Sequence, residues 1–98
     1  MISITERERS MVLDILKQTA PPGCAVWAFG SRLRMQHKPY SDLDLAIVAD
    51  KPLNLSQWGL LREAFDDSDL PYRVDIVDYR AASESFRRVI DKRYEVII

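Results

Sequence analysis

The sequence predicts a small α/β domain (α+β in the wider sense) in which about four helices flank one mixed β-sheet of about three to four strands. Three observations predict it. The chain has 98 residues, which is the length of one domain. Its 47% hydrophobic and 30% charged residues are an ordinary globular composition. Segments with helical apolar spacing alternate with short apolar runs of strand length. We therefore expect residues 1–98 to form a single domain, with no room for a second.

The first expected element is a helix from about Thr5 to Thr19. Two overlapping pairs, Ser3 with Glu6 and Thr5 with Glu8, have the spacing of a capping box just before an apolar helical face. A Pro-Pro-Gly sequence follows, which the interior of a helix does not tolerate. The helix should end there.

A continuous apolar run over residues 24–29 comes next, bounded by Gly23 and Gly30. Its length and composition predict a strand that is buried on both faces. Gly30 and Ser31 form the turn at its end. Ser31 is a good N-cap for a short helix through residues 32–35.

The second strand is expected over residues 42–48. Because side chains alternate along a strand, Asp42 and Asp44 share one face of it and the larger apolar residues share the other. A third strand is expected over residues 72–77, where Asp75 points away from its apolar neighbours. The sheet thus carries carboxylates on one face of at least two strands.

Two further helices and a terminal strand complete the pattern. Ser56 can cap a helix that runs through Trp58 to Phe65. The last helix should begin near Ser83. Residues 95–98 end in three β-branched side chains, which favours a short strand.

Composition excludes several classes of function. The 14 Lys and Arg residues against 15 Asp and Glu give a net charge of −1, so we do not expect a nucleic-acid partner. The absence of a long apolar run predicts no membrane span, and the single Cys24 with no signal-like N-terminus predicts a cytoplasmic protein. With one His and one Cys, a metal would have to be held by carboxylates, as Mg²⁺ or Mn²⁺ is.

The aspartates have a functional and a structural interpretation. Asp42 and Asp44 would lie side by side with Cα atoms about 6.5–7 Å apart, and Asp75 could complete the group if its strand is adjacent. Such a group suits two-metal phosphoryl transfer. Alternatively, Asp42 and Asp44 are solvated acids that cap the preceding loop. Gly30 and Ser31 are likewise either a phosphate cradle or an ordinary turn.

The combined frame is more specific than its parts. GSRLRMQHKPYSDLDLAIV has Gly30-Ser31, ten residues and then Asp42-x-Asp44. It resembles the signature of the DNA polymerase beta-like nucleotidyltransferase superfamily, and the small size and the VDIVDY run resemble its minimal nucleotidyltransferase (MNT) branch. The resemblance implies the nucleotidyltransferase fold, with the Gly-Ser pair on the nucleotide triphosphate, the two aspartates on the metals and Asp75 completing the catalytic site. Where relatives have Gly then Asp, this chain has Met35-Gln36.

The resemblance also implies the reaction. ATP with two Mg²⁺ ions, or Mn²⁺, would place its β and γ phosphates on the Gly30-Ser31 turn while an acceptor hydroxyl attacks the α-phosphorus. Asp75 would help to remove the acceptor proton. Arg32, with Arg34 and Lys38, would stabilise the triphosphate; the alternative is that these basic residues form a solvated loop.

MNT proteins commonly pair with an all-helical HEPN toxin, so the resemblance implies an antitoxin that transfers AMP from ATP to a toxin hydroxyl, expected to be that of a Tyr. Two alternatives remain. One is a binding module that neutralises its partner stoichiometrically without turnover, for which the apolar end of the chain could dock a sheet edge. The other is a nucleotidyltransferase for a small hydroxylated molecule such as an aminoglycoside, which lacks support because a separate acceptor domain is not expected here.

Overall fold

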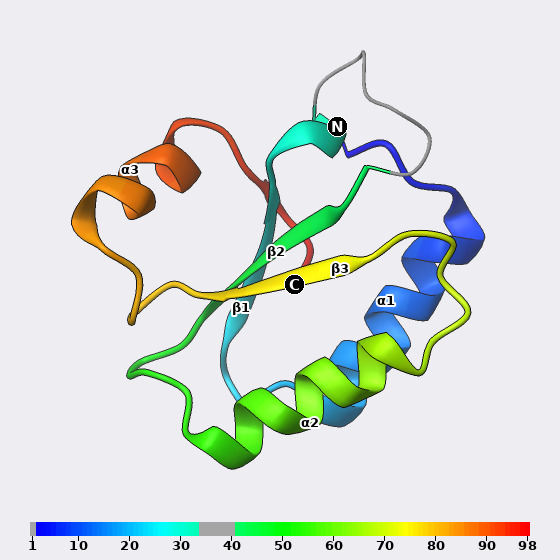
Figure 1. Cartoon of the computed structure of the whole chain (residues 1–98), viewed down its shortest axis with the longest axis horizontal. Helices are drawn as coiled ribbons and strands as arrows, with labels where there is room; N and C mark the ends of the chain where they lie inside the picture. The colour runs from blue at the N-terminus through cyan, green and yellow to red at the C-terminus, as the bar shows by residue number, and fades with distance from the viewer. Residues whose placement is uncertain (1, 34–40) are drawn as a thin grey trace.

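The computed structural model describes residues 2–33 and 41–98, apart from the side chain of Ser31. Figure 1 shows its arrangement: one sheet with helices on both sides. In chain order the elements are α1 (Glu6–Thr19), β1 (Ala25–Phe29), the 3₁₀ turn η1 (Ser31–Leu33), β2 (Leu43–Val48), α2 (Leu55–Asp66), β3 (Val74–Asp78), α3 (Glu84–Lys92) and β4 (Glu95–Val96).

The sheet has four strands in the order β3-β2-β1-β4. β1 pairs antiparallel with β2 and with β4, whereas β2 pairs parallel with β3. The parallel pair requires a crossover connection, and α2 supplies it. The expected mixed α/β fold is therefore confirmed.

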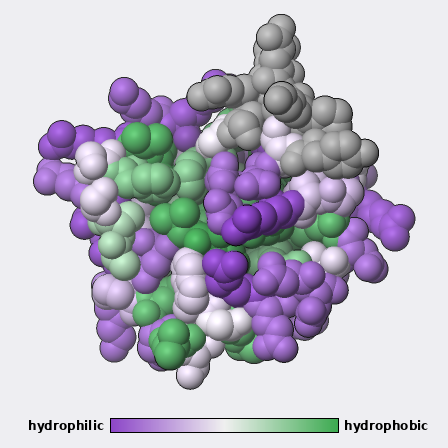
Figure 2. All heavy atoms as spheres, in the orientation of Figure 1, coloured by the Kyte–Doolittle hydropathy of each residue, from purple (hydrophilic) through white to green (hydrophobic). Residues whose placement is uncertain are grey.

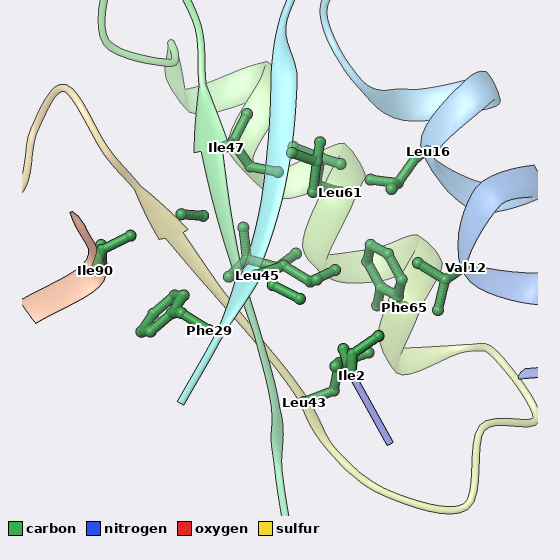
Figure 3. Close-up of a cluster of buried hydrophobic side chains, with 14 of the residues drawn as sticks. Ile2, Val12, Leu16, Phe29, Leu43, Leu45, Ile47, Leu61, Phe65 and Ile90 are labelled. Carbon is green, nitrogen blue, oxygen red and sulfur yellow. The ribbon is translucent and has the colours of Figure 1, made fainter. Parts of the chain in front are cut away.

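The sheet has one closed face. α1 and α2 lie together on it (Figure 1), and side chains such as Val12 of α1 and Leu61 of α2 point toward Leu45 of β2 (Figure 3). These three residues are at most 1% exposed. Because side chains alternate along a strand, each of the central strands presents its other residues to the opposite face.

That opposite face is covered in part by α3. Ile90 of α3 and Phe29 of β1 lie on this side in Figure 3, and both are buried. Trp27 stacks on Tyr94 with ring centroids 4.2 Å apart, and Phe29 meets Phe86 edge to face at 6.0 Å. Aromatic contacts from α3 and from the segment after it therefore pack on this face of the sheet.

The sequence offers two possible capping boxes for α1, and the structure shows which one forms. α1 uses the second of its two possible capping boxes: Thr5 Oγ1 accepts from the Glu8 N–H at 3.1 Å and the Glu8 carboxylate accepts from the Thr5 N–H at 3.0 Å. The backbone N–H of Ser3 instead donates to the Arg32 carbonyl at 2.9 Å. α3 begins beside Ser83, as predicted, and Ser83 caps it: the Ser83 hydroxyl accepts from the Phe86 N–H at 3.2 Å.

The predicted cap of α2 was wrong. Asn54, not Ser56, caps the helix, because Asn54 and Gln57 form a full capping box with hydrogen bonds of 2.8 and 3.0 Å. A reciprocal pair satisfies two backbone donors where a lone Ser would satisfy one. α2 therefore begins one residue before Ser56.

Other boundaries differ in detail. The expected helix after Ser31 is a single 3₁₀ turn over Ser31–Leu33, and the remainder of the range 32–35 lies outside the described residues. The described chain thus holds three α-helices and this one turn in place of about four helices. β3 runs from Val74 to Asp78, and β4 confirms the expected terminal strand with two residues. No helix in the described ranges has both the length and the apolarity that crossing a bilayer requires.

Candidate active site

Two carboxylates meet on the α3 face of the sheet. The strand register places Phe29 opposite Asp44 and Asp44 opposite Asp75. Residues paired across neighbouring strands share a face and lie about 4.8 Å apart in the pairing direction. The alternation predicted for both strands is therefore confirmed, and it brings Asp44 and Asp75 together. Asp42 is exposed and lies one residue before β2.

The electrostatics of this group are unfavourable without a cation. Burial, then the negative charges of Asp75 and Asp42, raise the pKa of Asp44 from 3.8 to about 6. Within the described residues, neither the Asp44 nor the Asp75 carboxylate makes a hydrogen bond or an ion pair. The face therefore concentrates negative charge.

Gly30 stands directly against Asp44. Its φ of +82° is a conformation that glycine adopts without strain. A Cβ atom added here would overlap Oδ2 of Asp44. Gly30 is thus required both for the turn after β1 and for the close approach of backbone and carboxylate. Ser31 begins the 3₁₀ turn, which the hydrogen bond from the Leu33 N–H to the Gly30 carbonyl closes at 3.1 Å.

A cavity of about 440 Å³ opens at this point. It is lined from five elements: the end of β1 with η1, the strands β2 and β3, and helix α3. Asp44, Asp75, Arg93 and the backbone at Gly30 form its polar part, and side chains that include Phe86 and Val89 form its apolar part. The cavity size is that of a small-molecule site, with few polar groups in an apolar wall.

A larger cavity of about 520 Å³ lies elsewhere, between the start of α2 and the end of β3. Its one carboxylate, Asp78, accepts hydrogen bonds from the backbone N–H of Leu53 at 2.8 Å and of Arg80 at 3.2 Å. That carboxylate holds two loops together. We therefore place the chemistry in the cavity beside Asp44 and Asp75.

Arg32 is not brought into this group. Its side chain is 4% exposed, and it donates to the Ser41 carbonyl at 3.0 Å and to the Ser3 carbonyl at 2.9 Å. Its guanidinium also lies 3.8 Å from the ring centroid of Tyr72. These contacts fasten the N-terminal segment and the start of β2 to η1. Arg34 and Lys38, the other expected cations, lie outside the described residues.

Arg93 is a cavity residue that the sequence did not reveal. It follows α3, lines the cavity and donates from Nη2 to the Leu33 carbonyl at 2.6 Å. In sequence it belongs to a basic pair that suits a helix C-terminus. Because its partner lies 60 residues away, no local pattern links the two.

The carboxylates of the cavity are oxygen ligands of the kind that a divalent cation binds. Among the described residues, no three His, Cys, Asp or Glu side chains lie together in an arrangement that could by itself hold a metal ion. Asp44 and Asp75, with Asp42 beside them, supply the hard oxygen donors that Mg²⁺ prefers when it shares its other positions with water and phosphate. A cation between them would also relieve the repulsion that raises the pKa of Asp44. The donor set thus suits a metal bound together with a phosphorylated substrate.

Comparison with known proteins agrees with this geometry. A family model described as "Polymerase beta, Nucleotidyltransferase" matches residues 12–98. The chain is 48% identical over 96 residues to the probable protein adenylyltransferase MntA of Haemophilus influenzae, and the match covers 98% of this chain and 83% of that protein.

Solved structures have the same fold. One is a toxin-antitoxin structure with AMP-PNP, which matches with a TM-score of 0.68 and 26% identity over 92% of this chain and 72% of the other. Another is a tri-AMPylated HEPN toxin of Shewanella oneidensis in complex with an MNT antitoxin, with a TM-score of 0.67 and 24% identity over 97% of this chain and 72% of the other. The second match, at its lower identity, supports the fold alone.

Proposed function

The chain belongs to the nucleotidyltransferase family of DNA polymerase beta, and from this premise we propose that it transfers AMP from ATP to a hydroxyl group of a partner protein. One observation carries the proposal: two in-register aspartates stand beside a tight glycine turn at the edge of a small-molecule cavity. The 48% identical relative, itself a probable protein adenylyltransferase, supports the same reaction.

Each site residue has a part in this proposal. Asp42 and Asp44 would hold divalent cations, Mg²⁺ with Mn²⁺ as the alternative, and Asp75 would complete their ligands. When bound, these ions would neutralise the phosphates and hold the attacking and leaving oxygens in line. The turn at Gly30 and Ser31 would receive the triphosphate, since glycine lets the backbone approach an anion closely. Arg32 would support that turn from behind through its carbonyl contacts.

The transfer forms one bond to the α-phosphorus and breaks another. The acceptor oxygen forms a bond to the α-phosphorus, the bond from the α-phosphorus to the bridging oxygen breaks, and pyrophosphate leaves. The acceptor proton would pass to Asp75, which stands on the cavity face. The apolar wall that includes Phe86 and Val89 would exclude water from the reacting atoms.

The proposed partner is a helical HEPN-type toxin, with a Tyr hydroxyl as the acceptor and silencing of the toxin as the result. A toxin-antitoxin structure with an ATP analogue, 26% identical to this chain, supports the pairing. We also propose that residues 1–98 act as a single nucleotidyltransferase domain in the cytoplasm, where ATP is available and the free thiol of Cys24 stays reduced.

A direct test measures label transfer. The protein is incubated with ATP labelled at the α-phosphate, Mg²⁺ and the helical protein encoded beside it. We expect labelled AMP on the partner, lost in the double variant Asp42→Asn with Asp44→Asn and retained in Asp69→Asn, because Asp69 is exposed and does not line the cavity. Transfer that persists in the double variant would contradict the proposal.

Stoichiometric neutralisation by binding alone is the second candidate. It is favoured by the edge strand β4, where Val96 is 55% exposed, and by Ile98, which follows the strand and is 41% exposed. The double variant separates the two functions. If it still protects cells from the toxin, binding is sufficient; if protection is lost while the complex still forms, catalysis is required.

A further inference from the structure

The cavity must supply positive charge as well as carboxylates. A bound triphosphate is strongly anionic, and the aspartates repel it unless cations intervene. The sequence pattern pointed to Arg32 for this purpose, but its guanidinium is held by two backbone carbonyls and the ring of Tyr72. Among the described residues, a basic side chain that faces the phosphates would therefore have to come from another position.

Arg93 is the basic residue among the described residues that line the cavity. α3 ends just before it: the Arg93 backbone is extended, and its N–H donates to the Ile90 carbonyl. From there the side chain reaches Leu33, the last residue of η1, with its Nη2 donating to the Leu33 carbonyl at 2.6 Å. Arg93 is thereby held beside the turn that begins at Gly30.

Its remaining hydrogen-bonding capacity is large. A guanidinium carries five N–H donors in a planar fork, and the structure shows one side-chain hydrogen bond for Arg93 within the described residues. Planar forks of this kind bind phosphate oxygens in pairs. Arg93 lines the same cavity as Asp44, which enters the cavity from β2.

The placement along the triphosphate follows from these contacts. Asp44 and Asp75 mark the end of the cavity where the α-phosphorus would react. Leu33 and Arg93 lie on the side of the turn, where the two terminal phosphates would rest. A cation there gains interaction energy as negative charge develops on the leaving group.

We propose that Arg93 binds the β and γ phosphates of ATP and stabilises the pyrophosphate as it leaves, a role that rests on the proposed function. The hydrogen bond to Leu33 positions the guanidinium at the end of the phosphate turn, and α3 thereby closes over the nucleotide. The substrate contact that the sequence suggested for Arg32 is made from the C-terminal part of the chain.

The test compares nucleotides that differ in their terminal phosphates. Binding of ATP, AMP and inorganic pyrophosphate with Mg²⁺ is measured by calorimetry for the wild type, Arg93→Gln and Arg93→Lys. Lys92→Gln is the matched control, because Lys92 is exposed, adjacent and absent from the cavity lining. We expect Arg93→Gln to weaken ATP and pyrophosphate binding by about 10- to 100-fold. AMP affinity should stay within about twofold, and Lys92→Gln should resemble the wild type.

A purely structural role for Arg93 gives a different pattern. If the residue only held η1 in place, Arg93→Gln would weaken AMP and ATP binding by the same factor, and this result would overturn the inference. Unchanged ATP affinity would overturn it as well. Should Arg93→Gln not fold, Arg93→Lys provides the test, because lysine keeps the charge but lacks the planar fork. We expect Arg93→Lys to lose about 3- to 10-fold in affinity for ATP and none for AMP. An ATP affinity equal to that of the wild type would contradict the proposal.

The same experiment separates this inference from the proposed function. If the wild type binds no ATP in the presence of Mg²⁺, the nucleotidyltransferase proposal itself fails. If the wild type binds ATP and Arg93→Gln binds it equally well, the role of Arg93 fails while the reaction stands.

Discussion

The two faces of the sheet are built from alternate residues of the same strands, yet they differ in almost every physical respect. On the closed face, Leu43, Leu45 and Ile47 are wholly buried under α1 and α2. On the opposite, open face, Asp44 and Asp75 stand in register beside a cavity, and α3 covers part of the face. The closed face stabilises the fold, while the open face concentrates like charges.

The comparison shows where stability and function come from. Burial of apolar side chains on the closed face is the main driving force for folding. The carboxylates on the other face oppose folding, because Asp44 is partly removed from water and repelled by Asp75 and Asp42. We infer that the closed face compensates for a site that is unfavourable until its ligands bind. Substitutions on the two faces should therefore have opposite effects on stability.

The largest change in stability is expected on the closed face. Leu45→Ala should lower the free energy of unfolding by about 2–5 kcal/mol, because it leaves a cavity among wholly buried side chains. Leu60→Ala is the matched control: this leucine is 51% exposed on α2, and its loss should change stability by less than about 0.5 kcal/mol. Urea unfolding of both variants measures the difference. Equal effects would mean that the closed face is not the stabilising one.

A glycine pair sharpens the comparison at the boundary between the faces. Gly30→Ala and Gly23→Ala both place a Cβ at positive φ, +82° and +77°, so each should cost about 1–2 kcal/mol of stability. At Gly30 the new Cβ also displaces the Asp44 carboxylate, whereas at Gly23 it meets no atom within 4 Å.

Activity should therefore separate the two glycine variants. We expect AMP transfer to fall at least about 100-fold in Gly30→Ala, since a displaced catalytic group costs that much, and to be retained in Gly23→Ala. The label-transfer assay compares them at equal concentrations of folded protein. Similar activities would indicate that the contact of Gly30 with Asp44 is not needed for catalysis.

On the open face, we expect a substitution to raise the stability, by less than Leu45→Ala lowers it. The pKa of Asp44 is raised to about 6 in the folded protein from 3.8. A group with a raised folded pKa adds stability that is intact below its unfolded pKa and is lost as the pH rises through its folded pKa. At about pH 8 the charge opposes folding, so Asp44→Asn should stabilise the metal-free protein by about 1–2 kcal/mol, after allowance for solvent screening of a half-buried group.

At about pH 4 the difference between Asp44→Asn and the wild type should nearly vanish, because the carboxyl is protonated in the folded wild type. Asp69→Asn, at an exposed position, serves as the control and should show little change at either pH. Thermal unfolding at the two pH values checks the expectation. Destabilisation at about pH 8 would show that repulsion does not dominate at Asp44.

The smallest effect concerns the start of α2. Asn54→Ala should cost about 1 kcal/mol, because it removes the side chain that accepts from the Gln57 N–H. Ser56→Ala should change stability by less than about 0.5 kcal/mol, since Ser56 lies inside the helix and is exposed. Urea unfolding again provides the measurement. A larger loss of stability in Ser56→Ala than in Asn54→Ala would indicate that Ser56 caps the helix, as the sequence suggested.

Features that depend on neighbouring residues were predictable from the sequence. Period-two alternation predicted which face of its own strand Asp44 and Asp75 each occupy, the capping signals predicted the start of α1, and helical spacing predicted the start of α3 near Ser83. The Gly-Ser frame predicted the turn that stands against Asp44. These signals are local, so one sequence carries them.

Features that depend on distant contacts were not predictable. Arg32 was assigned to the phosphates because it belongs to a local run of positive charge, but its side chain lies against Tyr72 and the carbonyls of Ser3 and Ser41. Arg93 reaches the cavity only because α3 folds back over the sheet. The direction of a long side chain depends on tertiary packing, which local periodicity does not record.

The most direct test of the difference between the faces combines stability and activity in one variant. Asp44→Asn is compared with the wild type at about pH 8 for the midpoint of unfolding without metal and for transfer of labelled AMP with Mg²⁺. We predict that the variant is more stable and loses AMP transfer by at least about 100-fold. A variant that is less stable than the wild type, or one that still transfers AMP at the wild-type rate, would contradict the assignment of the open face as the catalytic site.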